Sequence, residues 1–250
     1  NLISVWTEWW FQYFTWMAGG DLSSQNDDGT IELTFTDPAV EDAIEFYRKL
    51  IDAKVVQPDM TMEYGAMQEQ FAAGNASMTL YGSDGFRTFV NAGMNPEDIG
   101  YAPLPVGPSG EMTGQLGGNA NFIYSNASDE KANAVWEWIA FSNSKEETEA
   151  ALVDGASKGG ANPQVLFRND VDIDLGGISP DLQEVVDLVT PVSRLEFAGK
   201  AIVSQFVDSA VQRTMLDPSI DILEEFQRQE DLAQVEIDKY NQSILESNDG

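Results

Sequence analysis

Three tryptophans near the start of the chain have the type and spacing to bind a flat, ring-shaped molecule. Trp6, Trp9 and Trp10 lie in residues 5–17, which contain four further aromatic side chains. A sugar has C–H groups on both faces of its ring and hydroxyls around the rim, so a cleft that binds it needs flat aromatics and polar edges. The alternative is that most of these rings fill the core of an amphipathic helix. Three Trp residues on adjacent faces exceed what one helical stripe buries, so stacking on a ligand stays open.

Acidic side chains raise two other possibilities, glycoside hydrolysis and calcium binding. The chain has 42 Asp and Glu residues, so carboxylate pairs are expected from number alone, whereas hydrolysis needs two carboxyls held about 5 to 9 Å apart. A calcium loop counted from Ser24 fails because Phe35 takes the twelfth position, where Glu is required. A second run has Leu175 where the loop needs Gly; its acids are Asp170, Asp172 and Asp174. We expect both runs to be solvated loops and predict no metal site and no cofactor.

The composition excludes several classes of protein. The chain has no Cys and no His, which removes disulfides, thiol nucleophiles, His-based triads and imidazole or thiolate metal sites. A formal charge of −29 would repel nucleic acid and anionic membranes, so no nucleic-acid partner is expected. This acidity fits either adaptation to salty surroundings or a well-solvated secreted surface. With 42% hydrophobic residues and no long apolar run, the sequence predicts a folded, soluble protein.

The first part of the chain predicts helices alternating with strands. The aromatic segment 5–17 has helical spacing and ends at Gly19-Gly20, and residues 30–36 alternate as a half-buried strand does. Asp37-Pro38 begins a helix with Asp as the N-cap and Pro at the first helical position. A shorter helix then ends at Gly74, and residues 76–81 read as a buried strand.

The later part of the chain predicts one short strand and mostly helices. The strand covers residues 122–124. Ser128 caps one helix, and Ser144 has capping-box spacing for the next. Three further helices are predicted at 180–189, 199–216 and 219–245. Strands that alternate with helices indicate an α/β fold rather than a helical bundle.

The order of these signals resembles that of one family, the extracellular solute-binding proteins of the sugar-binding type. Each match is weak alone, but six in the same order and spacing are specific, and they cover nearly the whole chain. The matching segments are Ala18-Gly19-Gly20 at the end of the aromatic helix, residues 36–47 (TDPAVEDAIEFY), 71–78 (FAAGNASM) with Gly82 soon after, 100–105 (GYAPLP), 117–119 (GGN) and 134–139 (AVWEWI).

The resemblance implies a two-lobed α/β protein of the periplasmic-binding-protein type, which closes on its ligand across a hinge. Residues 1–103 and 165–250 would then belong to the C-terminal lobe, and residues 104–164 to the N-terminal lobe after a hinge crossing. The family's opening lobe would precede Asn1, so we expect the N-terminal lobe to be largely missing from this chain, roughly 100 to 150 residues on ordinary domain sizes.

The resemblance also implies ligand-binding residues. Trp9 is similar in position to an aromatic that stacks on sugar in a maltose-binding member of the family. The loop at 82–87 resembles a ligand-facing turn, with Asp84 accepting hydrogen bonds, Arg87 donating them and Phe86 offering a ring; the alternative is an ordinary β-turn. Gly118 and Asn119 would approach the ligand near the hinge. A further contact is implied, on a looser match, by Glu196, Phe197 and Gln205.

We therefore predict a protein that captures a sugar or oligosaccharide and does not catalyse a reaction. The family implies delivery to the permease subunits of an ABC importer by an extracellular or periplasmic monomer, lipid-anchored through a missing N-terminus. Two alternatives stay open: a secreted carbohydrate-active hydrolase that uses paired carboxylates, and a binding protein for a non-sugar solute.

Overall fold

The structure, a computed structural model, divides the chain into two compact units. It describes residues 7–57, 62–118, 120–157, 168, 170–171, 173 and 180–248. Unit 1 consists of Asn1–Gln70, Leu104–Leu116 and Val192–Gly250, and unit 2 consists of Phe71–Pro103 and Gly117–Pro191. Each unit is therefore assembled from segments that are distant in the sequence.

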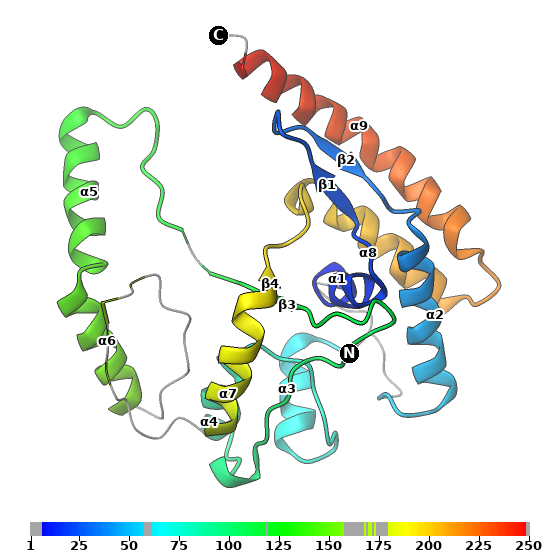
Figure 1. Cartoon of the computed structure of the whole chain (residues 1–250), viewed down its shortest axis with the longest axis horizontal. Coiled ribbons are helices and arrows are strands. Elements are labelled where there is room, and N and C mark those ends of the chain that lie inside the picture. The colour runs from blue at the N-terminus through cyan, green and yellow to red at the C-terminus, as the bar shows by residue number, and fades with distance from the viewer. Residues whose placement is uncertain are drawn as a thin grey trace. The chain divides into compact units, whose positions relative to one another are not determined.

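Unit 1 is a layer of helices packed on a small hairpin. Its helices are α1 (Thr7–Ala18), α2 (Pro38–Asp52), α8 (Lys200–Leu216) and α9 (Ile222–Asn248), and its strands are β1 (Ser23–Gln25), β2 (Ile31–Leu33), β3 (Gly114–Gln115) and β4 (Ser193–Arg194). β1 pairs with β2 in antiparallel register, and β3 pairs with β4 in parallel register. In Figure 1 the long α9 runs along the β1–β2 hairpin and beside α8.

The core of unit 1 joins the first fifty residues to the last fifty. Phe11 of α1 packs edge-on against Tyr47 of α2, with ring centroids 5.9 Å apart, and lies 5.8 Å from the ring of Phe226 on α9. Asn241 of α9 accepts from the backbone N–H of Ile31 at 2.8 Å and donates to the Ile31 carbonyl at 2.9 Å. This pair of bonds completes the outer edge of β2 and fixes α9 on the hairpin.

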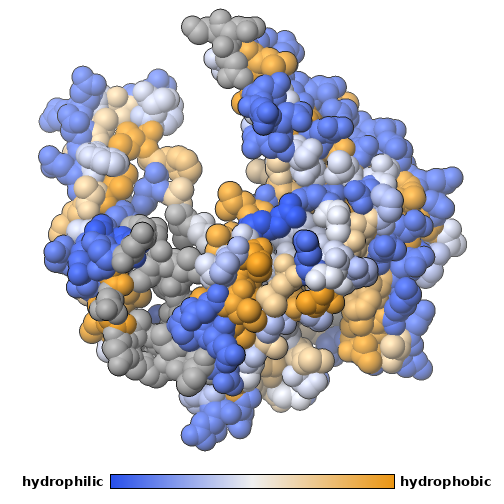
Figure 2. All heavy atoms as spheres, viewed as in Figure 1, coloured by the Kyte–Doolittle hydropathy of each residue, from blue (hydrophilic) through white to orange (hydrophobic). Residues whose placement is uncertain are grey.

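Unit 2 has a smaller core and exposed helices. It contains α4 (Gly85–Asn91), α5 (Asp129–Ser142), α6 (Lys145–Ser157) and α7 (Pro180–Val189), while α3 (Tyr64–Ala72) crosses the boundary between the units. Its core is formed by Phe86, Phe89, Ile99 and Leu182. The rings of Trp136, Trp138 and Phe141 on α5 are about three-fifths exposed, and Figure 2 shows hydrophobic side chains on the surface of this helix.

Local signals in the sequence are confirmed where they concern helix ends. The Asp37 side chain accepts from the backbone N–H of Ala39, as the N-cap of α2. Ser128 caps α5 by accepting from the Lys131 N–H, and Ser144 accepts from the Glu147 N–H at the start of α6. Because such caps form within one turn of chain, they need no distant partner.

Two predicted strands are wrong. Residues 76–81 and 122–124 belong to no sheet in the part of the chain that the structure describes, and Met78 and Phe122 are 85% and 86% exposed. The predicted strand at 30–36 is shortened to β2. An apolar run becomes a strand only when a neighbouring strand supplies main-chain partners, and alternation alone does not show that a neighbour is there. None of the described helices combines the length and apolarity needed to cross a membrane.

Candidate functional site

Trp9 lies at the centre of a polar and aromatic cluster on the surface of unit 1. Its side chain is half-buried on α1, and Gln12, one turn later, donates to the Trp9 carbonyl at 3.1 Å. The ammonium group of Lys200, the first residue of α8, lies 4.8 Å from the centroid of the Trp9 ring. At this distance the ring quadrupole attracts the cation, so Lys200 and Trp9 hold one another in place.

Two carboxylates hold the Lys200 ammonium. Its Nζ is 3.1 Å from Oε1 of Glu8 and 3.6 Å from Oε2 of Glu196. The Glu8 side chain is only 4% exposed, whereas that of Glu196 is 40% exposed. The buried pair interacts in a lower dielectric, so Glu8 is the stronger partner of Lys200.

A third carboxyl, Asp208 of α8, lies against Glu8. Its Oδ1 accepts from the Glu8 backbone N–H at 2.8 Å. The pKa of Asp208 is raised to about 7. Burial is the largest cause; a side-chain hydrogen bond with Glu8 and the charge of Glu8 also raise the pKa, whereas the backbone bond from Glu8 and the charge of Lys200 lower it. The other carboxylate oxygen of Glu8, Oε2, is buried without a hydrogen-bond partner in the described chain. A proton held by Asp208 can be shared with Glu8, as two neighbouring carboxyls usually do.

Tyr13 continues the aromatic surface along α1 to Trp16. Burial raises the pKa of the Tyr13 hydroxyl, Glu196 raises it further, and a hydrogen bond with Trp9 acts in the opposite direction. The Tyr13 and Trp16 rings meet edge to face, with centroids 5.7 Å apart. Trp9, Tyr13 and Trp16 therefore form one row on the helix, because residues three and four apart are neighbours.

The far end of this row repeats the arrangement at Trp9. The guanidinium of Arg194 lies 4.6 Å from the centroid of the Trp16 ring and pairs with Asp21, which also accepts from the Trp16 indole N–H at 3.0 Å. Trp16 is only 5% exposed, so its ring is buried within unit 1. At the other end Trp9 is only partly buried, with the Lys200 ammonium and its carboxylate partners beside its ring.

The other two predicted tryptophans differ from Trp9. Trp10 is 8% exposed, and its ring centroid lies 6.3 Å from that of Tyr13. It is thus part of the core, which is the alternative that the sequence left open. Trp6 and Asn119 lie outside the described residues.

Four of the predicted ligand-binding residues belong to unit 2: Asp84, Phe86, Arg87 and Gly118. Asp84 and Gly118 are exposed, and Arg87 lies within α4. Phe86 is 3% exposed and faces the core, where its ring is 6.3 Å from that of Tyr101. Burial raises the pKa of the Tyr101 hydroxyl, and the charge of Asp84 adds to this effect. The structure thus gives Phe86 a packing role within unit 2.

The three late residues are placed in different surroundings. Glu196 belongs to the Trp9 cluster through Lys200. Phe197 is 4% exposed, and its backbone N–H donates to Gln12 at 3.4 Å. Gln205 is exposed on α8.

Sequence reasoning missed Glu8, Lys200 and Asp208. One signal was available. The chain has only 13 basic residues, and Lys200 lies four residues after Glu196, a spacing at which oppositely charged side chains can pair. Nothing in the sequence shows that Glu8, near the opposite end of the chain, is the partner of Lys200.

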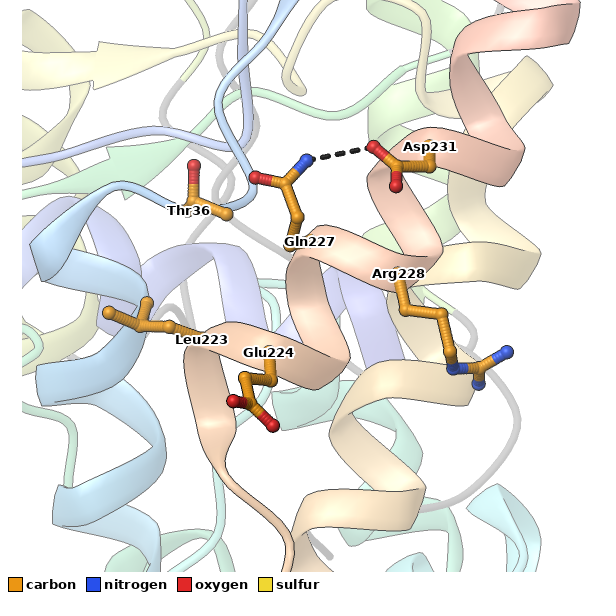
Figure 3. Close-up of a pocket in the computed structure, with 6 residues that line it drawn as sticks. All are labelled: Thr36, Leu223, Glu224, Gln227, Arg228 and Asp231. Carbon is orange, nitrogen blue, oxygen red and sulfur yellow. Dashed lines mark hydrogen bonds between the residues drawn. The ribbon is translucent and has the colours of Figure 1, made fainter.

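A shallow groove elsewhere on unit 1 lacks these features. It lies along the first turns of α9 and has a volume of about 490 Å³; its lining residues are Thr36, Leu223, Glu224, Gln227, Arg228 and Asp231. Figure 3 shows Gln227 donating to Asp231 across its edge, a bond of 2.9 Å. The groove has no aromatic ring, so it offers no stacking surface.

In the two acidic runs, the described Asp side chains bond to residues close to them in the sequence. Asp28 accepts from the backbone N–H and the hydroxyl of Thr30, which lowers its pKa. Asp170 forms a two-pronged pair with Arg168, with bonds of 2.8 and 2.7 Å. Asp172 and Asp174 lie outside the described residues. Among described side chains, no group of three or more acids could hold a metal ion.

Comparison with solved structures establishes the fold. MalE3 of T. maritima, bound to maltose, is 21% identical, with 92% of this chain and 57% of that chain covered and a TM-score of 0.71. UgpB of Mycobacterium tuberculosis, in complex with glycerophosphocholine, is 20% identical, with 95% and 58% covered and a TM-score of 0.66. An ABC transporter solute-binding protein of Thermotoga lettingae TMO, bound with α-D-tagatose, is 19% identical, with 92% and 56% covered and a TM-score of 0.70. The predicted α/β fold of the periplasmic-binding-protein type is confirmed.

The chain spans a little over half the length of these three proteins. No curated protein sequence matches it significantly. The sequence model of one family, described as bacterial extracellular solute-binding protein, matches residues 4–149, which is more than half of the chain. The predicted resemblance is therefore confirmed, and the chain belongs to the bacterial extracellular solute-binding proteins.

Proposed function

We propose that the chain is part of a receptor that captures a sugar or short oligosaccharide for an ABC importer, with Trp9 as the stacking surface. The observation that carries this proposal is a half-buried indole with hydrogen-bonding side chains beside it. The indole face that Lys200 leaves uncovered matches the C–H face of a sugar, and the carboxylate of Glu196 can accept hydrogen bonds from hydroxyls at its rim. Asp84, Arg87, Gly118 and Asn119 are proposed as further ligand contacts.

Two of the solved relatives support a sugar as the ligand, since their structures contain maltose and α-D-tagatose. The third supports a second candidate, a non-sugar solute, because it holds glycerophosphocholine. That ligand carries a quaternary ammonium group, which also binds aromatic faces. In this chain Lys200 already places a cation on one face of Trp9, which favours a neutral ligand over a cationic one.

We propose that binding occurs without catalysis, so the hydrolase alternative is not favoured. The paired carboxyls of Glu8 and Asp208 are engaged by Lys200 and by the Glu8 backbone, which leaves neither in the role of a free nucleophile. The family supports action outside the cytoplasm, and delivery to permease subunits by a monomer is part of the same proposal.

A thermal-shift screen of the chain tests the ligand class. The set contains neutral mono- and oligosaccharides, with glycerophosphocholine, amino acids and phosphorylated compounds as controls. A sugar at a hundred times its dissociation constant should stabilise the chain by about 2.7 kcal/mol. A stabilising sugar that is recovered intact supports the receptor. Stabilisation by control compounds alone overturns the sugar, and release of shorter products overturns binding without catalysis.

A further inference from the structure

Lys200 covers one face of the Trp9 indole. An indole has two faces, and a cation 4.8 Å from the ring centroid takes the place where a ligand ring would stack on that side. The Lys200 side chain is 17% exposed, so it lies packed against the protein rather than extended into solvent. A stacking ligand is thereby directed to the opposite face of the ring.

Glu8 holds Lys200 in this position. Its carboxylate is 3.1 Å from the ammonium and nearly fully buried, and Glu8 directly precedes Trp9 on α1. The contact thus joins the first turn of α8 to the first turn of α1. Because charge pairs strengthen as water is excluded, this contact fixes the lysine more firmly than the exposed Glu196 does.

Asp208 places a second carboxyl beside Glu8. The two carboxyls are neighbours, since Asp208 accepts from the backbone N–H of Glu8 at 2.8 Å. The buried Oε2 of Glu8 has no partner in the described residues, so a shared proton is the group that would satisfy it. A proton bound to Asp208 removes one negative charge from the surroundings of Lys200, so the cluster attracts Lys200 less strongly.

We propose that Lys200 is a positioning residue for Trp9, held over one face of the indole by Glu8, and that a proton on Asp208 loosens this hold. The consequence for ligand binding rests on the proposed function, whereas the coupling of Asp208, Lys200 and Trp9 does not. The described charged groups that act on Asp208 are Glu8 from α1 and Lys200 from α8, and Lys200 is also paired with Glu196 from the segment before α8. Arg48 of α2 is directed elsewhere, to the carbonyls of Thr214 and Ile220.

The direction of the pH effect follows from these charges. Above neutral pH Asp208 is ionised, and the cluster holds Lys200 and the indole most firmly. As the pH falls through about 7, Asp208 takes up a proton and the hold weakens. The orientation of Trp9 should therefore change near neutral pH, and sugar affinity should decrease on the acidic side.

Fluorine NMR of the 250-residue chain labelled with 5-fluorotryptophan tests the coupling without a ligand. Comparison with Trp9→Phe assigns the Trp9 resonance, which is followed from about pH 5 to about pH 9. We expect a shift with a midpoint near 7 in the wild-type chain. Asp208→Asn, which keeps the acceptor for the Glu8 N–H, should abolish the shift, and Lys200→Met, which keeps the apolar stem, should displace the resonance and make it insensitive to pH.

Arg194→Met is the matched control, because Arg194 covers Trp16 on the same helix as Lys200 covers Trp9. It should displace the Trp16 resonance and leave the titration of Trp9 unchanged. A Trp9 resonance that does not titrate in the wild-type chain, or that still titrates in Asp208→Asn, overturns the proposal.

Maltose binding measured against pH separates this inference from the proposed function. We expect maltose to bind the wild-type chain more weakly in acid, and Lys200→Met to bind it roughly tenfold more weakly at alkaline pH with the pH dependence lost, in line with a partly desolvated cation–π contact. Maltose binding that is equal in the wild-type, Lys200→Met and Asp208→Asn chains overturns the positioning role. Absence of maltose binding together with the expected fluorine titration contradicts the proposed function for this sugar and supports the coupling.

Discussion

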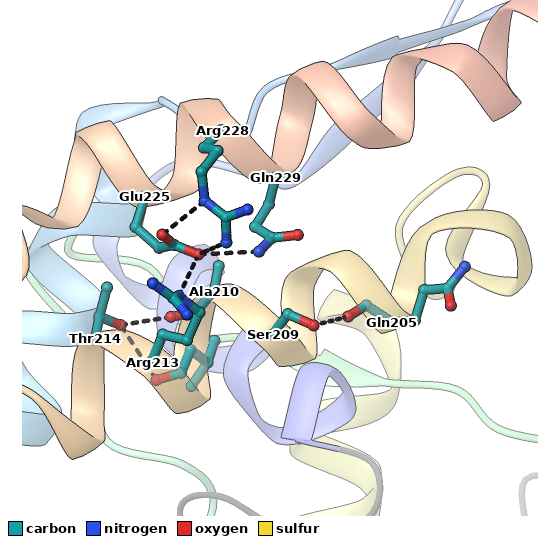
Figure 4. Close-up of polar contacts among 9 residues, drawn as sticks. Gln205, Ser209, Ala210, Arg213, Thr214, Glu225, Arg228 and Gln229 are labelled. Carbon is teal, nitrogen blue, oxygen red and sulfur yellow. Dashed lines mark hydrogen bonds and ion pairs between the residues drawn. The ribbon is translucent and has the colours of Figure 1, made fainter.

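Arg213 on α8 and Glu225 on α9 form an ion pair with 3.0 Å between Nε and Oε1, although the Glu225 side chain is only 5% exposed. Arg228 and Gln229 donate to the same carboxylate, so three side chains converge on it, as Figure 4 shows. These contacts lower the pKa of Glu225 from 4.5 to about 2; the hydrogen bonds from Arg228 have the largest effect. Glu225 therefore joins the two C-terminal helices through charge as well as packing.

The Glu225 contact should make unit 1 sensitive to acid. A carboxyl whose pKa is lower in the folded state adds stability above its unfolded pKa, and this contribution is lost as the pH falls from about 4.5 to about 2. Glu225→Gln should reduce that pH dependence and lower the free energy of unfolding at neutral pH by roughly 1–3 kcal/mol. Urea unfolding at a series of pH values measures both.

A matched control for this prediction lies on the same helix. Glu236 pairs with Lys239 at 2.7 Å, but the two side chains are 44% and 65% exposed, against 5% for Glu225. Glu236→Gln should change stability by less than about 1 kcal/mol, because exposed pairs contribute little. Equal effects of the two substitutions would show that burial of Glu225 does not matter.

Trp9 and Trp10 should respond differently to replacement by Ala. Trp9→Ala should weaken sugar binding by roughly 1–3 kcal/mol and change stability less than Trp10→Ala does, because the Trp9 side chain is only partly buried. Trp10→Ala should lower the free energy of unfolding by about 3–5 kcal/mol, because Trp10 is in the core. Calorimetric titration and denaturant unfolding measure these two quantities. Unchanged sugar affinity in Trp9→Ala removes Trp9 from the binding site.

Asp208 should destabilise the chain as the pH rises. Its pKa is raised in the folded state, from 3.8 to about 7, so the folded chain binds the proton more tightly than the unfolded chain. Stability then falls between about pH 4 and about pH 7 and levels off above that range. Asp208→Asn should be more stable than the wild type at pH 8 by on the order of 1–2 kcal/mol, a value reduced for solvent screening. Thermal unfolding of both chains at several pH values measures this, and parallel curves would contradict it.

Phe86 should matter for the stability of unit 2. Phe86→Ala removes a ring that is 3% exposed and should cost about 3–5 kcal/mol, visible as lost hydrogen-exchange protection in α4 and α7. Phe122→Ala is the control, since Phe122 is 86% exposed, and it should change stability by no more than about 0.5 kcal/mol. Loss of sugar binding in Phe86→Ala with unchanged protection would instead assign Phe86 to the ligand site.

Helix ends and helix faces could be predicted from the sequence because their causes are local. Asp37, Ser128 and Ser144 cap helices within a few residues of themselves. Val40, Ile44 and Tyr47 are four and three residues apart, which is helical spacing, and all three are buried on one face of α2. The strands at 76–81 and 122–124 were wrong because a strand depends on a neighbour that its own residues do not specify.

The candidate site could be predicted only in part, for the same physical reason. The aromatic spacing of residues 5–17 identified Trp9, and Glu196 followed from the resemblance to the family. The contact between Glu8 and Lys200 joins opposite ends of the chain, so it depends on the tertiary fold. Whether a ring such as Phe86 faces solvent or the core likewise depends on residues far from it, here Leu182.

The assembly of unit 1 from the two ends of the chain also affects the order of its folding. Phe11, Ile31 and Tyr47 obtain their partners only when Val207, Phe226 and Asn241 are present. Contacts of such high sequence separation close large loops and form slowly. During synthesis from the N-terminus, the apolar faces of α1, α2 and the hairpin therefore lack their packing partners until α9 has left the ribosome. The core of unit 1 therefore cannot close before residues 200–248 have been made.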